Sequence, residues 1–161
     1  MKILPKLTHP ILVAAALSTA AALVTAGNAR AQVPPNLAEA AAYAGLHAAA
    51  WNGDVAAIGR SAGNKAALEA RDANGRTPLH VAAFAKQRGA VKALLAAGAD
   101  PAALENGRYD AVTIASVADD EETLALLLAA GASAKLVTSR YDGSALIAAA
   151  HLGHDGVVRQ L

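Results

Sequence analysis

The chain has 161 residues and no cysteine, which excludes disulfides, thiol nucleophiles and thiolate metal sites. Alanine and leucine carry most of its apolar content and only 3% of its residues are aromatic, a composition that favours short, closely packed helices. The formal net charge is +1, but three of the 14 basic residues precede Gln32, so 11 basic residues face 13 acidic ones in the remainder. That balance offers no basic field to a phosphate backbone, and we expect no nucleic-acid partner.

The segment from Met1 to Ala31 has the layout of a secretory signal peptide. Two lysines precede an uncharged stretch over 11–26 that is rich in Leu, Val and Ala, and the segment closes with Ala-Arg-Ala at Ala31. Small residues at these last positions fit signal peptidase, so we predict cleavage after Ala31 and a mature chain over 32–161 in the periplasm of a Gram-negative bacterium. The apolar stretch is short for a stable membrane span, and we expect no stable insertion after processing. A retained membrane anchor is the alternative.

A fixed period runs through the mature chain. Gly98-Ala99 recurs as Gly131-Ala132, and Leu46-His47 recurs at the same spacing as Leu79-His80. Self-similarity at such a period is typical of stacked repeat proteins, in which each unit buries its apolar face against its neighbours. We therefore predict a repeat architecture for the mature chain.

Each repeat is predicted to contain two helices. Thr77 can cap a first helix and Pro78 suits its first position, while a second helix through Leu94 and Leu95 ends at Gly98, which can adopt a left-handed conformation. The Asn-Gly and Asp-Gly steps between repeats favour tight turns, so we expect hairpins that project in an exposed row. The corresponding first-helix starts in the other three repeats are Ala44, Asp110 and Ser144.

The stretch from Asp72 to Asp100 resembles an ankyrin repeat nearly throughout. The residues that carry this resemblance are Asp72-Ala73-Asn74-Gly75-Arg76-Thr77-Pro78-Leu79-His80-Val81-Ala82-Ala83 and Leu94-Leu95-Ala96-Ala97-Gly98-Ala99-Asp100. The resemblance extends over about residues 37–161, and the whole is similar to ankyrin proteins that Gram-negative bacteria export to the periplasm. It implies an all-α solenoid of about four helix-turn-helix repeats with projecting β-hairpin loops, the last repeat being incomplete. It also implies a protein-interaction module that has no catalytic activity, cofactor or small-molecule substrate.

Two repeats depart from this pattern. In repeat one, Lys65 stands in place of the glycine, and three small residues over 59–63 weaken the second helix. In repeat three, Ala111-Val112-Thr113 replaces the Pro-Leu-His step, and the acidic run over 119–122 is expected to be a solvated helix start. The chain ends within the second helix of repeat four, where an apolar face over 157–161 is expected to be exposed.

The histidines invite a metal or catalytic interpretation, but structural roles are favoured. The ankyrin resemblance implies that His47 and His80 bond the backbone of a neighbouring hairpin, and that His154 belongs to a packing step. His151 with His154 forms at most a weak metal cluster, and a hydrolase triad of Ser144, His151 and Asp142 lacks a nucleophile elbow and oxyanion donors. Elemental analysis would test the metal-dependent alternative. We expect a protein that is not an enzyme.

The five aromatic residues fall at positions that the ankyrin resemblance assigns to the partner-facing surface, outside the consensus core. Together with nearby arginines they have the composition of an interface, so we predict that a protein partner binds the hairpin tips and the concave helix face. In the alternative interpretation, Trp51 and Phe84 fill gaps between alanine-rich helices. An accessory role in peroxide defence is a further hypothesis from the resemblance. The predicted partner-facing residues are Tyr43, Trp51, Arg71, Asn74, Arg76, Phe84, Tyr109, Arg140, Tyr141 and His151.

Overall fold

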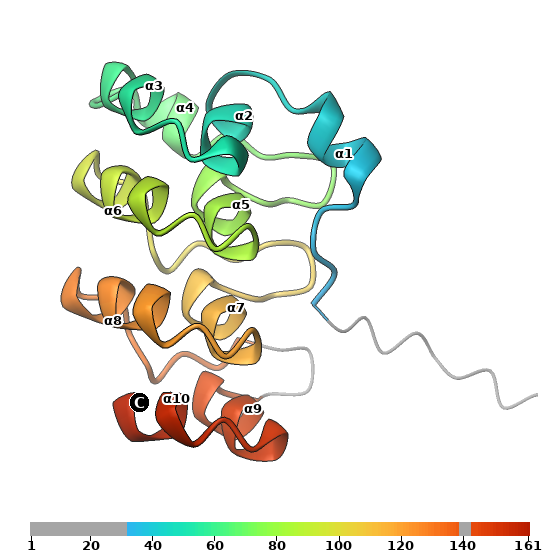
Figure 1. Ribbon diagram of the computed structural model, residues 1–161, viewed down its shortest axis with the longest axis vertical. Coiled ribbons are helices and arrows are strands. Elements are labelled where there is room, and N and C mark those ends of the chain that lie inside the picture. Colours follow the sequence, from blue (N-terminus) through green and yellow to red (C-terminus); the bar gives the residue numbers. More distant parts are fainter. Residues whose placement is uncertain (1–31, 139–142) are drawn as a thin grey trace, which may run out of the picture.

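The computed structural model describes residues 32–138 and 143–161, and in this part of the chain helix pairs stack in four layers (Figure 1). The predicted signal peptide, with its cleavage position at Ala31, lies outside the described residues. Each layer contains a first helix, which packs on the first helix of the next layer. The first helices are α2 (Gly45–Asn52), α5 (Pro78–Phe84), α7 (Ala111–Val117) and α9 (Ala145–Leu152).

The second helices form a row beside the first helices, on the left in Figure 1. A short helix, α1 (Leu37–Ala42), precedes the first layer and lies beside the loops between repeats. The second helices are α3 (Val55–Arg60), α6 (Arg88–Ala96), α8 (Glu121–Ala129) and α10 (Asp155–Gln160), with α4 (Lys65–Leu68) as an additional turn after α3. The predicted all-α repeat architecture is therefore confirmed.

The predicted starts of the first helices are confirmed in all four layers. The side chains of Thr77, Asp110 and Ser144 each accept a hydrogen bond from the backbone N–H three residues later, while Ala44 occupies the same position without a side-chain bond. Helix α6 ends at Ala96, and the Gly98 that follows has a φ of +96°, the left-handed conformation expected at a helix end.

The core lies between the two rows of helices and between successive layers. Fully buried leucine, isoleucine and valine side chains of the second helices, such as Ile58, Leu94 and Leu124, pack against alanines of the first helices, such as Ala82 and Ala115. Alanine keeps the first helices thin, so that successive layers can stack closely. This regular stacking places equivalent residues of successive repeats in columns along the molecule.

Repeat one departs from the others as predicted, because its second helix breaks after Arg60 and resumes only as the single turn α4. The expectation of a solvated acidic helix start in repeat three is wrong for one residue. Asp120 is the N-cap of α8 but is buried, and its carboxylate accepts hydrogen bonds from Arg88 and from the Thr123 hydroxyl. Within the described residues, none of the helices has the length and apolar character needed to cross a bilayer.

Candidate partner-binding face

The loops between repeats form tight hairpins on the side of the first helices (Figure 1). In the hairpin of repeat two, the Asp72 amide donates to the Arg76 carbonyl oxygen and the Gly75 amide donates to the Asp72 carbonyl oxygen. The next hairpin repeats this pattern between residues 105 and 109, and the Asn106 amide donates to the Asn74 carbonyl oxygen across the two tips at 3.0 Å. These two tips are thereby held in register with each other.

Two histidines connect the first helices to these hairpins. The Nε2 atom of His47 lies 2.9 Å from the Arg76 carbonyl oxygen, and that of His80 lies 3.1 Å from the Tyr109 carbonyl oxygen. In His80, Nδ1 accepts from the Thr77 amide, so Nε2 carries the proton. Burial lowers the pKa of His80 to about 4, so its imidazole is neutral. The predicted structural role of both histidines is confirmed.

This column of histidines stops after repeat two. The third residue of each first helix is His47, His80, Thr113 and Ile147 in turn. The shorter Thr113 side chain donates to Asp110 at 2.7 Å and lies 2.6 Å from the Thr138 hydroxyl, while Ile147 contributes a side chain that is 61% exposed. In the third layer this column therefore has a small hydroxyl side chain in the place of an imidazole.

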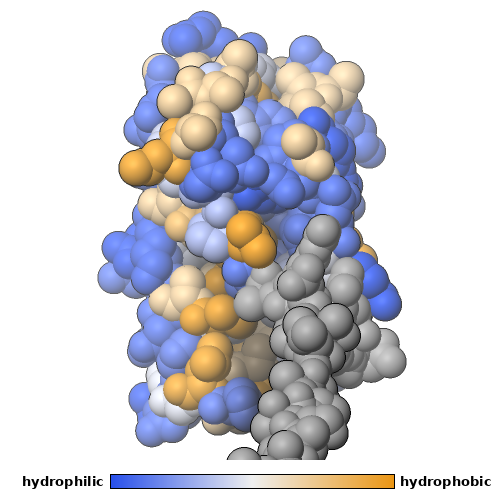
Figure 2. Space-filling view, turned by 90° about the vertical axis from the view of Figure 1, so that its right-hand side faces the viewer, coloured by the Kyte–Doolittle hydropathy of each residue, from blue (hydrophilic) through white to orange (hydrophobic). Residues whose placement is uncertain are grey.

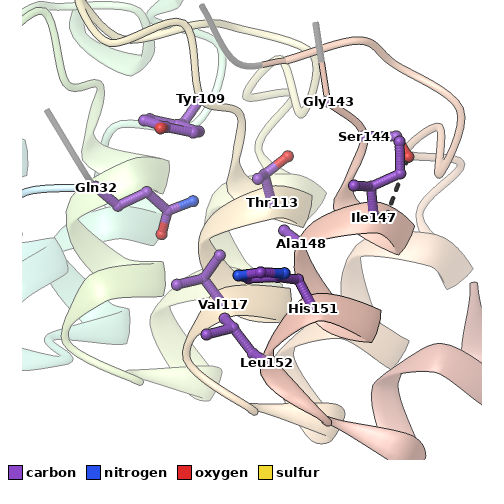
Figure 3. A pocket seen from close by; sticks show the side chains of 10 residues that line it. All are labelled: Gln32, Tyr109, Thr113, Val117, Gly143, Ser144, Ile147, Ala148, His151 and Leu152. Carbon is purple, nitrogen blue, oxygen red and sulfur yellow. Dashed lines mark hydrogen bonds between the residues drawn. The ribbon is translucent and has the colours of Figure 1, made fainter. Parts of the chain in front are cut away.

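A pocket of about 420 Å³ opens at this place, between α7 and α9 (Figure 3). We call it the α7–α9 pocket. Its walls are predominantly apolar, and the Tyr109 ring and the Gln32 side chain close it on the hairpin side. Its lining residues are Gln32, Tyr109, Thr113, Val117, Gly143, Ser144, Ile147, Ala148, His151 and Leu152.

The seventh residues of the first helices form a second column on the same helical face, because residues four apart share one face. Its members are Trp51, Phe84, Val117 and His151, and the last two line the α7–α9 pocket. Trp51 and Phe84 are partly exposed and also pack against the core. Their partial exposure fits the predicted partner-facing surface, and their packing against the core fits the alternative that they fill gaps between helices.

The first helices carry no Lys, Arg, Asp or Glu side chain, whereas every second helix carries at least one. The floor of the candidate face is thus free of formal charge apart from its histidines. Hydrophobic residues gather in the lower part of the hairpin side, whereas its upper part is mostly hydrophilic (Figure 2). Among the exposed large apolar residues of the described chain, Leu146, Ile147 and Leu152 all lie on α9.

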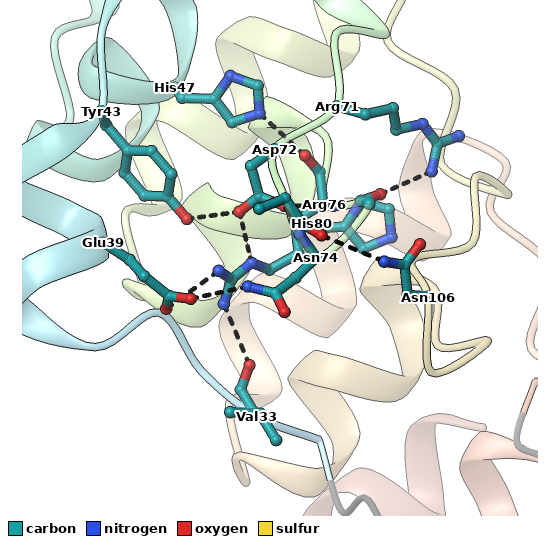
Figure 4. A network of polar contacts seen from close by, with 12 residues as sticks. Val33, Glu39, Tyr43, His47, Arg71, Asp72, Asn74, Arg76, His80 and Asn106 are labelled. Atoms are coloured by element: carbon teal, nitrogen blue, oxygen red, sulfur yellow. Dashed lines mark hydrogen bonds and ion pairs between the residues drawn. The ribbon is translucent and has the colours of Figure 1, made fainter.

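The upper part contains a polar network around Arg76, which is only 1% exposed (Figure 4). The Arg76 guanidinium lies 2.7 Å from the Asp72 carboxylate and 3.1 Å from the Glu39 carboxylate, and it donates to the Val33 carbonyl oxygen at 3.2 Å. The Tyr43 hydroxyl donates to Asp72 at 2.8 Å. The network fastens α1 and the segment before it to the hairpin of repeat two.

The electrostatics of this network favour the ionised carboxylates. Burial raises the pKa of Asp72, but hydrogen bonds from the Arg76 backbone and guanidinium and from Tyr43 outweigh it, so the net pKa lies below its usual value. The bond from the Asn36 amide, supported by Arg76 and Asn74, lowers the pKa of Glu39. Burial and the bond to Asp72 raise the pKa of the Tyr43 phenol.

The structure corrects the exposure expected for several predicted partner-facing residues. Arg76 and Tyr109 are buried, so the prediction that they are exposed is wrong, because each is enclosed between hairpins and neighbouring helices. Tyr43 and Asn74 are half-buried and bond to Asp72 and Glu39. Arg71 is exposed but donates to the Gly75 and Leu104 carbonyl oxygens. Arg140 and Tyr141 lie outside the described residues.

The α7–α9 pocket was not predicted from the sequence, although its signal was visible in the replacement of the Pro-Leu-His step. His151 lies exposed at the rim of this pocket, while His154 Nδ1 donates to the Ser116 carbonyl oxygen at 2.8 Å. Across residues 32–138 and 143–161, no three His, Asp or Glu side chains are grouped to hold a metal ion. The Ser144 hydroxyl caps α9, and Asp142 is not among the described residues.

Comparison with known proteins agrees with this architecture. The family model for ankyrin repeats (three copies) matches residues 12–105 and 46–138. No curated protein matches the chain. The repeat length, the stacked helix pairs and the family match together show that the chain belongs to the ankyrin repeat family, whose repeats are protein–protein interaction modules.

Proposed function

We propose that this chain is an exported, non-catalytic interaction module that binds a periplasmic or envelope protein through its hairpin tips and first helices. The observation that carries the proposal is the composition of that face: first helices without formal charge, ending in exposed apolar residues of α9. Ile147 is 61% exposed and Leu152 is 50% exposed beside an open apolar pocket. Exposed apolar surface rimmed by polar hairpins is typical of protein-binding sites.

The proposed site of action follows from the layout of the segment from Met1 to Ala31. A charged start, an apolar stretch and an Ala-x-Ala ending direct a chain to the export machinery and to signal peptidase. N-terminal sequencing of the protein expressed in a Gram-negative host should therefore begin at Gln32. Recovery of intact Met1 in the membrane fraction would instead support a membrane-tethered scaffold, and would contradict processing.

Partner capture tests the binding role. The protein, purified as it accumulates in the periplasm of the host, serves as bait for periplasmic extract of its own bacterium. We expect a protein retained by the wild-type chain and by a control variant on the second helices, Lys92→Ala, which lies on an exposed part of α6. The Trp51→Ala and Phe84→Ala double variant should retain less of it. Equal retention by all three proteins would place the binding surface elsewhere.

A further inference from the structure

The α7–α9 pocket exists because this chain leaves its own repeat pattern at two successive positions. In repeats one and two, a histidine reaches from the first helix to the next hairpin at 2.9 and 3.1 Å. Thr113 still reaches the next hairpin through the Thr138 hydroxyl, but its side chain is smaller than an imidazole, and Ile147 points a large apolar side chain toward the opening (Figure 3). The smaller side chain of the third layer thus leaves open space between α7 and α9.

The pocket has the size and chemistry for an uncharged apolar group. Its volume of about 420 Å³ lies at the lower end of the range of about 300–1,000 Å³ typical of ligand sites. Val117, Ala148 and Leu152 supply its apolar walls, and neither helix that forms it carries a Lys, Arg, Asp or Glu residue. A charged side chain would lose its hydration against these walls, and neither α7 nor α9 offers it an opposite charge.

One polar group of the lining, the Gln32 amide, points to the rest of the ligand. The Gln32 side-chain nitrogen Nε2 is buried, and it has no hydrogen-bond partner in the described structure. Gln32 lines the pocket, with its amide directed toward α7 (Figure 3). A buried amide N–H without an acceptor costs about 1–3 kcal/mol, and a ligand carbonyl oxygen placed beside it would remove that cost.

We propose that the α7–α9 pocket anchors one large uncharged side chain of the partner protein, whose adjacent backbone carbonyl accepts a hydrogen bond from Gln32. This assignment rests on the proposed function and specifies its partner: an extended segment with an exposed Phe, Leu or similar residue. The apolar walls receive the side chain, and the Gln32 amide fixes the direction of the peptide. The apolar walls disfavour a charged side chain at this position.

The experiment uses N-acetyl-phenylalaninamide, which combines an apolar side chain with two carbonyl groups, and follows its binding by ¹H–¹⁵N NMR of the protein. We expect saturable shift changes in α7, in α9 and in the Gln32 side-chain amide. The lysine and glutamate analogues of the probe should bind at least about tenfold more weakly. Shifts confined to other helices, or equal affinity for the charged probes, would overturn the assignment.

Two variants fill the pocket from opposite walls. Thr113→His restores the residue found in repeats one and two, and Ala148→Leu enlarges a wall residue with a good helix former. Each should lower the affinity for the phenylalanine probe about tenfold or more. The matched control Ala125→Leu, at an exposed position of α8, should leave that affinity unchanged. Undiminished binding to both filled variants would refute the pocket assignment even if one variant were destabilised.

The same proteins separate this inference from the proposed function. If extract proteins bind the wild type and both filled variants equally, while the probe does not bind, the anchor is refuted and the interaction role stands. If the probe binds the wild type alone but no protein is retained, the pocket is supported as a site for this chemistry and the proposed function fails.

Discussion

Replacing Arg76 by methionine should destabilise the protein strongly, because it removes the cation that joins three segments of the described chain. The guanidinium contacts the carboxylates of Asp72 and Glu39 and the carbonyl oxygen of Val33. Methionine keeps most of the length and apolar stem of arginine but none of its charge. The two carboxylates are then left without their shared partner.

The expected cost follows from the exposure of each carboxylate. Breaking a buried ion pair by removing one partner costs about 3–5 kcal/mol, and the Asp72 side chain is only 10% exposed. Asp72 keeps its bonds from Tyr43 and from the Asn74 and Arg76 amides, which places the cost at the lower end. Glu39 is 32% exposed and adds less than about 1 kcal/mol. We therefore expect a loss of about 3 kcal/mol in the free energy of unfolding.

Urea unfolding followed by circular dichroism measures this loss, with Arg60→Met as the control. Arg60 is exposed at the end of α3 and pairs with no carboxylate of the described residues, so its loss should cost less than about 0.5 kcal/mol. Amide hydrogen exchange should also accelerate over residues 33–39 in the Arg76 variant alone, since that segment loses its attachment. Equal destabilisation by the two substitutions would refute the argument from burial, and unchanged exchange would refute the attachment.

Three further changes test other parts of the structure. The folded-state pKa of His80, about 4, lies below the ordinary value of 6.5, so its neutral form contributes stability that is present above pH 6.5 and lost as pH falls through 4. Between these two pH values, urea titrations should show the free energy of unfolding of the wild type falling by about 2 kcal/mol more than that of His80→Gln. Gly98→Val should cost about 1 kcal/mol or more through its positive φ alone, since a Cβ there meets no neighbouring atom, whereas thermal melts should show little change for Ala97→Val. The Trp51→Ala and Phe84→Ala double variant should remain helical by circular dichroism but bind the captured partner about 2 kcal/mol more weakly by calorimetry; unfolding would assign both residues to the core.

The repeat pattern predicted the local structure because it encodes interactions within one unit. Thr77 as a helix cap and Gly98 at a helix end follow from contacts within the repeating unit, whereas the link from His80 to the next hairpin was implied by the ankyrin resemblance. The regular helices and most of the core could therefore be derived from periodicity and capping chemistry.

Contacts between non-equivalent positions could not be predicted in this way. Arg76 is buried because Glu39 and Val33, which precede the first repeat, fold back onto its hairpin, and no periodic signal places them there. Asp120 is buried because stacking brings Arg88 of the preceding layer beside it. The sequence places acidic and basic residues near the hairpins and helix starts, but only the stacking of the layers determines which of them form ion pairs and which are exposed to solvent.

The two halves of the candidate face differ in how many of their side chains are still free to contact a partner. In the upper half, Arg76 and Asp72 already use their charges on each other, and Trp51 and Phe84 have already lost part of their exposure to the core. In the lower half, Ile147 and Leu152 keep half or more of their surface in water. Complete burial of such a side chain contributes about 1.5–3 kcal/mol, so covering the remaining half of each is worth about 1 kcal/mol apiece. A partner therefore gains more apolar contact over α9 and the adjoining pocket than over the aromatic residues that the sequence pattern brings to attention first.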